Sequence, residues 1–207
     1  MIKAIIFDLD GVLVDATEWH YEALNKALNL FGFEITRYEH LVKYNGLPTK
    51  KKLEMLTLDK SFPKALHPLV NKLKQKYTMD EIYIKCRPSF EKQLMLASLK
   101  RRGFKLAVAS NAIRPSVELM LEKSGLIEYF DFIIGNTDVK KPKPDPEIYN
   151  VTIGKLRLTP EEVVIVEDAP HGIEAAISSG SKVIKVRGYA DVNLGLIDDF
   201  IAREGGN

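Results

Sequence analysis

The stretch IIFDLDG, residues 5–11, joins a short apolar run to two carboxylates and a glycine. The apolar residues from Lys3 to Phe7 predict a buried strand. Asp8 and Asp10 follow directly, and like charges at this spacing repel each other unless a cation or a shared proton offsets them. The stretch therefore predicts a buried strand that ends at a site for positive charge.

The next part of the chain has a helical pattern only. From residue 17 to about residue 83, apolar residues recur with helical spacing and are interrupted by turn signals. The first of these helices is expected over residues 17–31. Its apolar stripe consists of Trp19, Ala23, Ala27, Leu30 and Phe31. This region therefore reads as an all-helical insert.

After residue 88 the pattern changes to an alternation of strands and helices. Strands are expected over residues 106–109, 132–134, 163–166 and 182–186, and helices over residues 90–102, 115–124, 146–156 and 172–179. Such alternation is typical of an α/β fold with a doubly wound, Rossmann-like parallel sheet. We therefore expect two domains. Residues 1–15 and 84–207 form the α/β core, and residues 16–83 form a small all-helical domain inserted after the first strand.

Composition excludes several classes of protein. The chain has 207 residues, a net charge of +2 and one cysteine, Cys86, so it has no internal disulfide. Its first apolar run is too short for a signal peptide, and no later run is long enough to span a membrane. We therefore expect a cytoplasmic protein without a membrane partner.

Positive charge is concentrated in the helical insert. Nine lysines lie between residues 43 and 76, against two acids. Most of them are expected on solvated helix faces, and a few could attract an anionic substrate. The block has no arginine and few aromatic residues, both of which nucleic-acid binding would favour. We therefore expect no nucleic-acid partner.

Polar residues follow four of the expected strands. Besides Asp8 and Asp10, these are Ser110, Asn111, Lys140, Lys141, Glu167 and Asp168. In an open parallel sheet, reactive groups gather beyond the carboxyl ends of the strands. A nucleophilic carboxylate, a hydroxyl, a lysine and acids suited to Mg²⁺ are the groups that phosphoryl transfer requires. The sequence has neither a cysteine and histidine cluster for zinc nor a P-loop.

Four motifs occur in order at these strand ends: Asp8-x-Asp10-Gly-Val, Ser110-Asn111, Lys141-Pro-x-Pro-Asp145 and Glu167-Asp168-x-x-x-Gly172. With them the chain resembles the haloacid dehalogenase superfamily, in the branch of β-phosphoglucomutases and phosphoglycolate phosphatases that carry a helical cap. The resemblance covers the core from Met1 to about Arg187. It implies that residues 16–83 are the cap.

The resemblance also implies a role for each motif. Asp8 would attack phosphorus and become an aspartyl phosphate, and Asp10 would protonate the leaving oxygen and then activate the incoming nucleophile. Ser110 and Asn111 would bind phosphate, and Lys141 would bridge Asp8 and the phosphoryl group. Magnesium would be held by Asp8, Asp168 and the backbone carbonyl of Asp10, with Glu167 as a ligand or a support.

The neighbours of these motifs receive lesser roles. Lys140 competes with Lys141, but Lys141 is favoured because a proline follows it directly, as in the family. Asp15 is expected at a hinge or turn, and Arg114 is expected to face solvent.

In the cap, the resemblance points to two substrate-binding candidates, His20 and Lys50. β-Phosphoglucomutase has an arginine three residues after the glycine of its specificity loop, whereas this chain has Thr49 there, followed by Lys50. This departure favours a phosphatase over a mutase, because lysine cannot grip phosphate in the bidentate way of arginine. Lys76 is a further cap candidate.

The leading expectation is a magnesium-dependent phosphatase of a small phosphorylated metabolite such as a sugar phosphate. A sugar phosphate mutase is the alternative, and a non-catalytic binding protein on the same fold is a third reading. Either a monomer or a small homo-oligomer fits the sequence.

Overall fold

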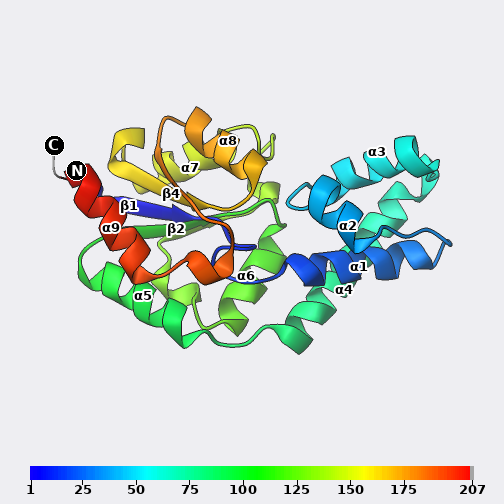
Figure 1. The fold of residues 1–207 in the computed structure, drawn as a ribbon, viewed down its shortest axis with the longest axis horizontal. Helices are drawn as coiled ribbons and strands as arrows, with labels where there is room; N and C mark the ends of the chain where they lie inside the picture. The colour runs from blue at the N-terminus through cyan, green and yellow to red at the C-terminus, as the bar shows by residue number, and fades with distance from the viewer. Residues whose placement is uncertain (206–207) are drawn as a thin grey trace. The chain divides into compact units, whose positions relative to one another are not determined.

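A five-stranded parallel sheet in the order β3-β2-β1-β4-β5 organises the first of two units of the chain (Figure 1). The structure, a computed structural model, describes residues 1–205. Its contacts divide the chain into one unit formed by Met1–Asp15 and Arg87–Asn207 and a second formed by Ala16–Cys86. The strands are β1 (Ala4–Phe7), β2 (Lys105–Ala109), β3 (Phe132–Ile134), β4 (Val163–Glu167) and β5 (Lys182–Lys185). The expected α/β fold with a doubly wound parallel sheet is confirmed.

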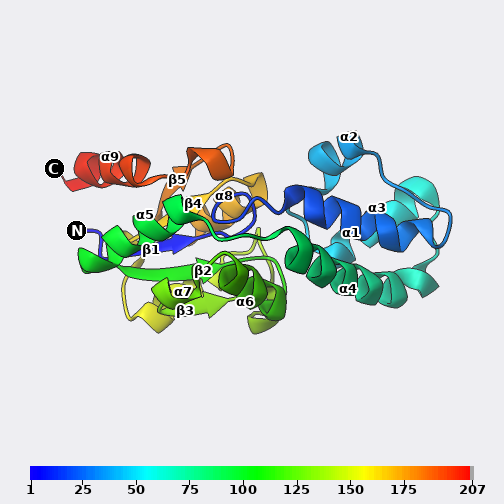
Figure 2. The same ribbon diagram turned by 90° about the horizontal axis from the view of Figure 1, so that it is seen from below.

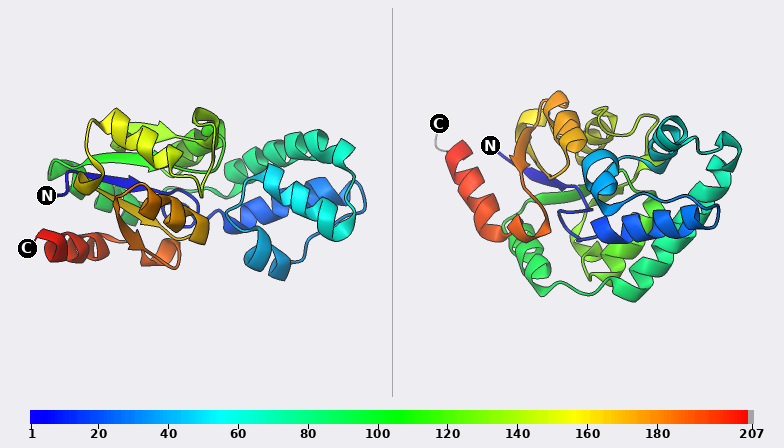
Figure 3. Two further views of the ribbon diagram at one scale, coloured as in Figure 1. Left: turned by 90° about the horizontal axis from the view of Figure 1, so that it is seen from above. Right: turned by 45° about the vertical axis from the view of Figure 1, so that its right-hand side comes forward.

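Helices lie on both faces of this sheet. Those of the first unit are α5 (Phe90–Arg101), α6 (Arg114–Lys123), α7 (Glu147–Leu156), α8 (Pro170–Ser178) and α9 (Leu194–Gly205). Figures 1 and 2 show α7 and α8 on one face, and α5, α6 and α9 on the other. Helix α9 has no counterpart among the expected elements, and in Figure 3 it lies at the same end of the unit as the start of β1.

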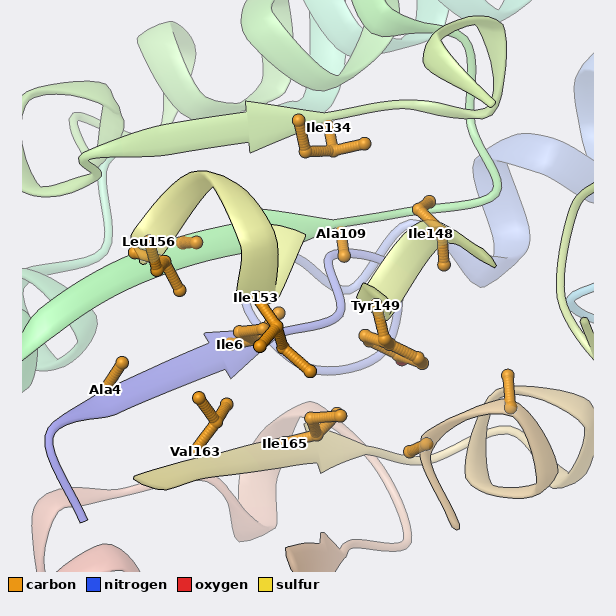
Figure 4. Close-up of a cluster of buried hydrophobic side chains, with 13 residues drawn as sticks. Ala4, Ile6, Ala109, Ile134, Ile148, Tyr149, Ile153, Leu156, Val163 and Ile165 are labelled. Atoms are coloured by element: carbon orange, nitrogen blue, oxygen red, sulfur yellow. The ribbon is translucent and has the colours of Figure 1, made fainter. Parts of the chain in front are cut away.

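The core beneath α7 and α8 is apolar and fully packed. Alternate residues of the central strands, such as Ile6 and Ile165, point toward Ile153 and Tyr149 of α7 (Figure 4). These side chains are at most 4% exposed. Because successive side chains of a strand point to opposite faces, Ile5 and Phe7 are directed to the face of α5 and α6. A strand buried on both faces explains why the run before Asp8 is continuously apolar.

Strand register aligns the polar residues that matter for chemistry. Phe7 lies opposite Val108 of β2 and Val166 of β4. The residues that follow these three therefore reach the same edge of the sheet, and the amide of Asp8 donates to the carbonyl of Val166 at 3.0 Å. The expected meeting of strand ends thus follows from main-chain pairing.

The second unit is entirely helical over its described elements. It contains α1 (Thr17–Asn29), α2 (Arg37–Glu39), a π-helical turn His40–Tyr44, α3 (Thr49–Lys60), a 3₁₀ turn Lys64–Leu66 and α4 (His67–Lys85). Helix α4 continues two residues beyond the expected domain boundary at residue 83. Among residues 1–205, no helix has both the length and the apolar character needed to cross a membrane.

The apolar stripe of α1 differs from the expected one. Ala23 and Ala27 are buried as expected, but Leu24 and Leu28 complete the buried face. Leu30 is 61% exposed because the helix ends at Asn29, so the chain has already left the helical path at this residue. The expectation that Leu30 lies on the buried stripe is therefore wrong.

His40 makes the stability of the helical unit sensitive to acid. It is fully buried, and neither ring nitrogen has a hydrogen-bond partner. Burial, reinforced by the positive charge of Lys52, lowers the pKa of His40 to about 4. An unfolded chain has a histidine pKa of about 6.5. The contribution of neutral His40 to the free energy of unfolding is therefore complete above pH 6.5. It is lost as the pH falls toward 4, and the total loss is about 3 kcal/mol.

We expect His40→Phe to flatten this pH dependence, because phenylalanine fills the same buried space without a titrating group. The measurement is urea unfolding at pH 7, 5.5 and 4.5, followed by the fluorescence of Trp19, the chain's one tryptophan, which lies in α1. His67→Phe in the same unit is the matched control and should retain the wild-type slope, since His40 is still present. A His40→Phe variant with the wild-type slope would contradict the expectation.

Candidate active site

The loop after β1 brings two acids to the edge of the sheet in a tight turn. The amide of Gly11 donates to the carbonyl of Val14 at 2.8 Å, and Leu13 donates to Leu9 at 2.9 Å. Gly11 has a φ of +83°, and a Cβ at this position would overlap the carboxylate of Asp168. Glycine is therefore required both for the turn and for its close approach to β4. Asp8 is buried and Asp10 is half-buried.

A buried lysine bridges Asp8, which follows β1, and Glu167, the last residue of β4. The Nζ of Lys143 donates to Asp8 Oδ1 at 2.6 Å and to Glu167 Oε2 at 2.7 Å. Its side chain is 1% exposed. Lysine is almost never buried to this extent unless it is paired, so the two carboxylates explain its position.

The lysine beside Asp8 is not the one expected. The side chain of Lys141 is 72% exposed, and its Nζ lies 3.5 Å from Asp145. The prediction that Lys141 bridges Asp8 is therefore wrong, and Lys143 lies in that place. The sequence held the signal, because the pattern Lys-Pro-x-Pro begins both at Lys141 and, two residues later, at Lys143. Lys140 precedes both and is exposed.

Hydrogen bonds from the main-chain amides of these lysines determine which lysine side chain reaches Asp8. The carboxylate of Glu147 accepts from the amides of Lys140 and Lys141 at 2.9 and 3.0 Å. The Oδ1 of Asn111 accepts from the amide of Lys143 at 3.0 Å. The side chain of Asn111 thus connects the loop of Lys143 to the end of β2.

Ser110 reaches the expected edge of the sheet. Its amide donates to Ile134 of the neighbouring strand β3 at 3.0 Å, and its Oγ accepts from the amide of Ala112 at 3.0 Å. The hydroxyl is buried and oriented by this turn. Phosphate binding by Ser110 and Asn111 stays a prediction.

The electrostatics of the site are dominated by uncompensated negative charge. Burial, together with the charge of Glu167, raises the pKa of Asp8 well above its usual value, and Lys143 offsets only part of this effect. Burial and the charge of Glu167 likewise raise the pKa of Asp168 to about 7. Burial lowers the pKa of Lys143, but Asp8 and Glu167 more than offset this and raise it well above its usual value.

The carboxylates fit a divalent cation. Oxygen atoms of Asp8, Glu167 and Asp168 lie within 4.8 Å of one another. The Oδ1 of Asp168 is buried and has no hydrogen-bond partner, which costs free energy unless another group satisfies it. Hard oxygen ligands of this kind suit Mg²⁺.

The expected substrate-binding residues of the helical unit differ in their surroundings. The Nδ1 of His20 lies 3.1 Å from the Nζ of Lys74 on α4. Lys50 and Lys76 are exposed. Lys74 was not among the expected residues, because its spacing does not distinguish it from the other lysines of its helix. Substrate binding by His20 and Lys50 stays a prediction.

One further residue of the site was missed. Tyr149 of α7 is fully buried, and its hydroxyl donates to Glu167 Oε2 at 2.6 Å. In the sequence it occupies an ordinary core position of a helix, so periodicity accounts for its ring but gives no sign of this hydrogen bond.

The fold and these motifs define a class of protein, namely α/β proteins with a parallel sheet and acidic residues at the ends of its first and fourth strands. The family model described as haloacid dehalogenase-like hydrolase matches residues 5–186. The chain therefore belongs to the haloacid dehalogenase-like hydrolases, and it is a phosphoric monoester hydrolase of this type.

Curated relatives match over most of their length. A phosphorylated carbohydrates phosphatase of Thermotoga maritima is 32% identical over 86% of this chain and 82% of its own. A phosphoglycolate phosphatase of Aquifex aeolicus is 30% identical over 98% of this chain and 93% of its own.

Solved structures agree on the fold. CbbY from Rhodobacter sphaeroides, solved in complex with phosphate, superposes with a TM-score of 0.80 at 27% identity over 91% of this chain and 88% of its own. A β-phosphoglucomutase from Clostridium difficile superposes with a TM-score of 0.82 at 23% identity, over 98% of this chain and all of its own, and this likeness concerns the fold alone.

Proposed function

We propose that this hydrolase is a magnesium-dependent phosphatase that cleaves a small phosphomonoester, a sugar phosphate or a similar metabolite, through an aspartyl phosphate on Asp8. The observation that carries the proposal is the buried Asp8–Lys143–Glu167 network next to the unsatisfied Asp168. The relatives named above, a phosphatase of phosphorylated carbohydrates and a phosphoglycolate phosphatase, support a substrate of this class.

Two of the acids are proposed to bind the metal ion. Asp8 and Asp168 would hold Mg²⁺, together with the backbone carbonyl of Asp10. When bound, this ion offsets the charge that accumulates on the phosphoryl oxygens. The raised pKa values of Asp8 and Asp168 support this assignment, because a bound cation favours the ionised carboxylates.

The nucleophile is oriented by Lys143. Since Lys143 holds one oxygen of Asp8, the carboxylate cannot rotate freely, and the fixed orientation reduces the entropic cost of attack. Attack forms a bond between an Asp8 oxygen and phosphorus and breaks the ester bond from phosphorus to the leaving oxygen. That oxygen takes a proton from Asp10.

The second half of the reaction reverses the proton transfer. Asp10, now ionised, takes a proton from a water molecule, whose oxygen attacks phosphorus and releases Asp8 and inorganic phosphate. The ammonium of Lys143 stays charged throughout, since the two carboxylates raise its pKa. It therefore acts as a fixed positive charge.

A substrate panel tests the proposal. The protein is incubated with Mg²⁺ and each of a series of sugar phosphates, phosphoglycolate and other small phosphomonoesters, and both free phosphate and positional isomers are measured. We expect release of phosphate from at least one compound, and loss of this activity in excess chelator. Isomerisation without release would show that a sugar hydroxyl replaces water and would identify a mutase. The absence of both activities with every compound of the panel would contradict the proposed substrate class.

A further inference from the structure

Tyr149 contacts Lys143, the lysine beside Asp8, and also Glu167, the second partner of that lysine. Its hydroxyl donates to Glu167 Oε2 at 2.6 Å, and its ring centroid lies 4.8 Å from the Nζ of Lys143. We infer that Tyr149 is a positioning residue of the active site, whose hydroxyl fixes Glu167 and occupies part of its Oε2, so that Lys143 is shared between Glu167 and Asp8. The inference rests on the proposed function for its effect on turnover, but the contacts of Tyr149 do not depend on that function.

All the acceptor sites of Glu167 are occupied by protein donors. Its Oε2 accepts from Lys143 and Tyr149, and its Oε1 accepts from the amides of Asp168 and Ala169, both at 3.1 Å. An ionised carboxylate offers about four such sites. Glu167 is therefore an internal counter-ion of Lys143, and cation binding falls to Asp8 and Asp168.

The carboxylate of Glu167 is also held sterically. A Cβ at Gly172 would overlap it, so the start of α8 packs directly against its oxygens. The hydrogen bonds that Lys143 and Tyr149 donate to its Oε2 restrain it further. Glu167 is thus a carboxylate of fixed orientation, with the hydroxyl of Tyr149 as one of its donors.

Loss of the hydroxyl should affect the lysine rather than the substrate. Without it, Glu167 Oε2 keeps Lys143 as its remaining side-chain donor. A buried carboxylate that loses one donor attracts the other more strongly, so the ammonium moves toward Glu167 and its contact with Asp8 weakens. Tyr149 is fully buried, so substrate binding should change little.

A purely structural role for Tyr149 in the core is the alternative to a positioning role, and removal of its hydroxyl distinguishes the two. Its ring belongs to the apolar core under α7, and a core tyrosine needs some partner for its hydroxyl. Tyr149→Phe keeps the ring and removes only the hydroxyl. If Glu167 merely satisfies a core tyrosine, this change alters stability and leaves turnover unchanged.

The experiment compares Tyr149→Phe with Tyr44→Phe, which removes the hydroxyl of the other fully buried tyrosine, in the helical unit. For Tyr149→Phe we expect kcat to fall about tenfold, as for loss of one charge-assisted hydrogen bond, with KM within about twofold of wild type. The affinity for Mn²⁺, measured by electron paramagnetic resonance, should also stay within about twofold. Tyr44→Phe should leave all three values unchanged.

A second readout does not depend on turnover. Fluoroberyllate mimics a phosphoryl group on a carboxylate, and its affinity for the magnesium-loaded protein, followed by ¹⁹F resonance, reports the alignment of Lys143 with Asp8. We expect this affinity to fall in Tyr149→Phe and not in Tyr44→Phe. Equal affinities in wild type and Tyr149→Phe would overturn the inference, even for a protein in which no substrate is found and the proposed function has failed.

Kinetic outcomes separate the remaining possibilities. An unchanged kcat, or a change confined to KM, would overturn the positioning role. A fall in Mn²⁺ affinity as large as the fall in kcat would show that Glu167 contacts the cation, which also contradicts the inference. Phosphatase activity in wild type with a selective loss of kcat in Tyr149→Phe supports both the proposed function and the role of Tyr149.

Discussion

Asp8→Asn is expected to lower turnover by about 10⁴-fold or more, because it removes the attacking oxygen while the neighbouring groups remain. An amide is a poor nucleophile, and no described carboxylate takes the same position at the end of β1. The measurement is phosphate release by the best substrate of the panel, together with acid-quench trapping of a phosphorylated protein. Neither turnover nor a trapped phosphoenzyme should be detected in the variant.

The same variant should remain folded. Asn has the size of Asp, and it relieves the repulsion among Asp8, Glu167 and Asp168, so the thermal midpoint without metal should not fall. Asp15→Asn makes the same substitution at an exposed position of the same loop and should retain wild-type turnover. Wild-type turnover in Asp8→Asn would remove Asp8 as the nucleophile.

The second large effect is expected for Lys143→Met. Loss of this ammonium removes a positive charge placed beside the nucleophile, and kcat should fall about 10²- to 10³-fold. It also leaves two buried carboxylates without their counter-ion, which should lower the free energy of unfolding by about 3–5 kcal/mol. The first quantity is measured at saturating Mg²⁺, and the second is measured by urea unfolding without the metal.

Lys141→Met is the control for that prediction. Its side chain is exposed and pairs weakly with Asp145, and an exposed pair of this kind contributes little to stability. We expect kcat and the free energy of unfolding to stay near their wild-type values. The reverse result, with a large loss in Lys141→Met and none in Lys143→Met, would restore Lys141 to the site and contradict the structure.

Much of the sheet could be predicted from sequence, because the runs that form β1 and most of β4 are buried on both faces and are therefore apolar. The run before Asp8 and the run Val163 to Val166 both lie where expected. Strand ends then predicted which polar residues meet. This inference needs only the direction and order of the strands, which the alternating pattern supplies.

What could not be predicted depends on tertiary contacts. Lys141 and Lys143 have nearly equal sequence contexts, and the choice between them is made by Asn111, which comes from a different strand. Leu30 fits a helical stripe but lies beyond the helix end. The amphipathic helix α9 lies past the last motif and has no counterpart among the expected elements. For Lys143 the deciding partner is distant in sequence, whereas Leu30 is decided by where the helix ends.

The two glycines that face the acids of β4 give the site a property that its side chains do not reveal. Gly11 lies against Asp168 and Gly172 against Glu167, and a single methyl group at either position would occupy space that a carboxylate now fills. The active site thus requires a residue without a side chain at two positions. A change from glycine to alanine, normally among the mildest substitutions, would here act on the catalytic acids as directly as a change to the acids themselves.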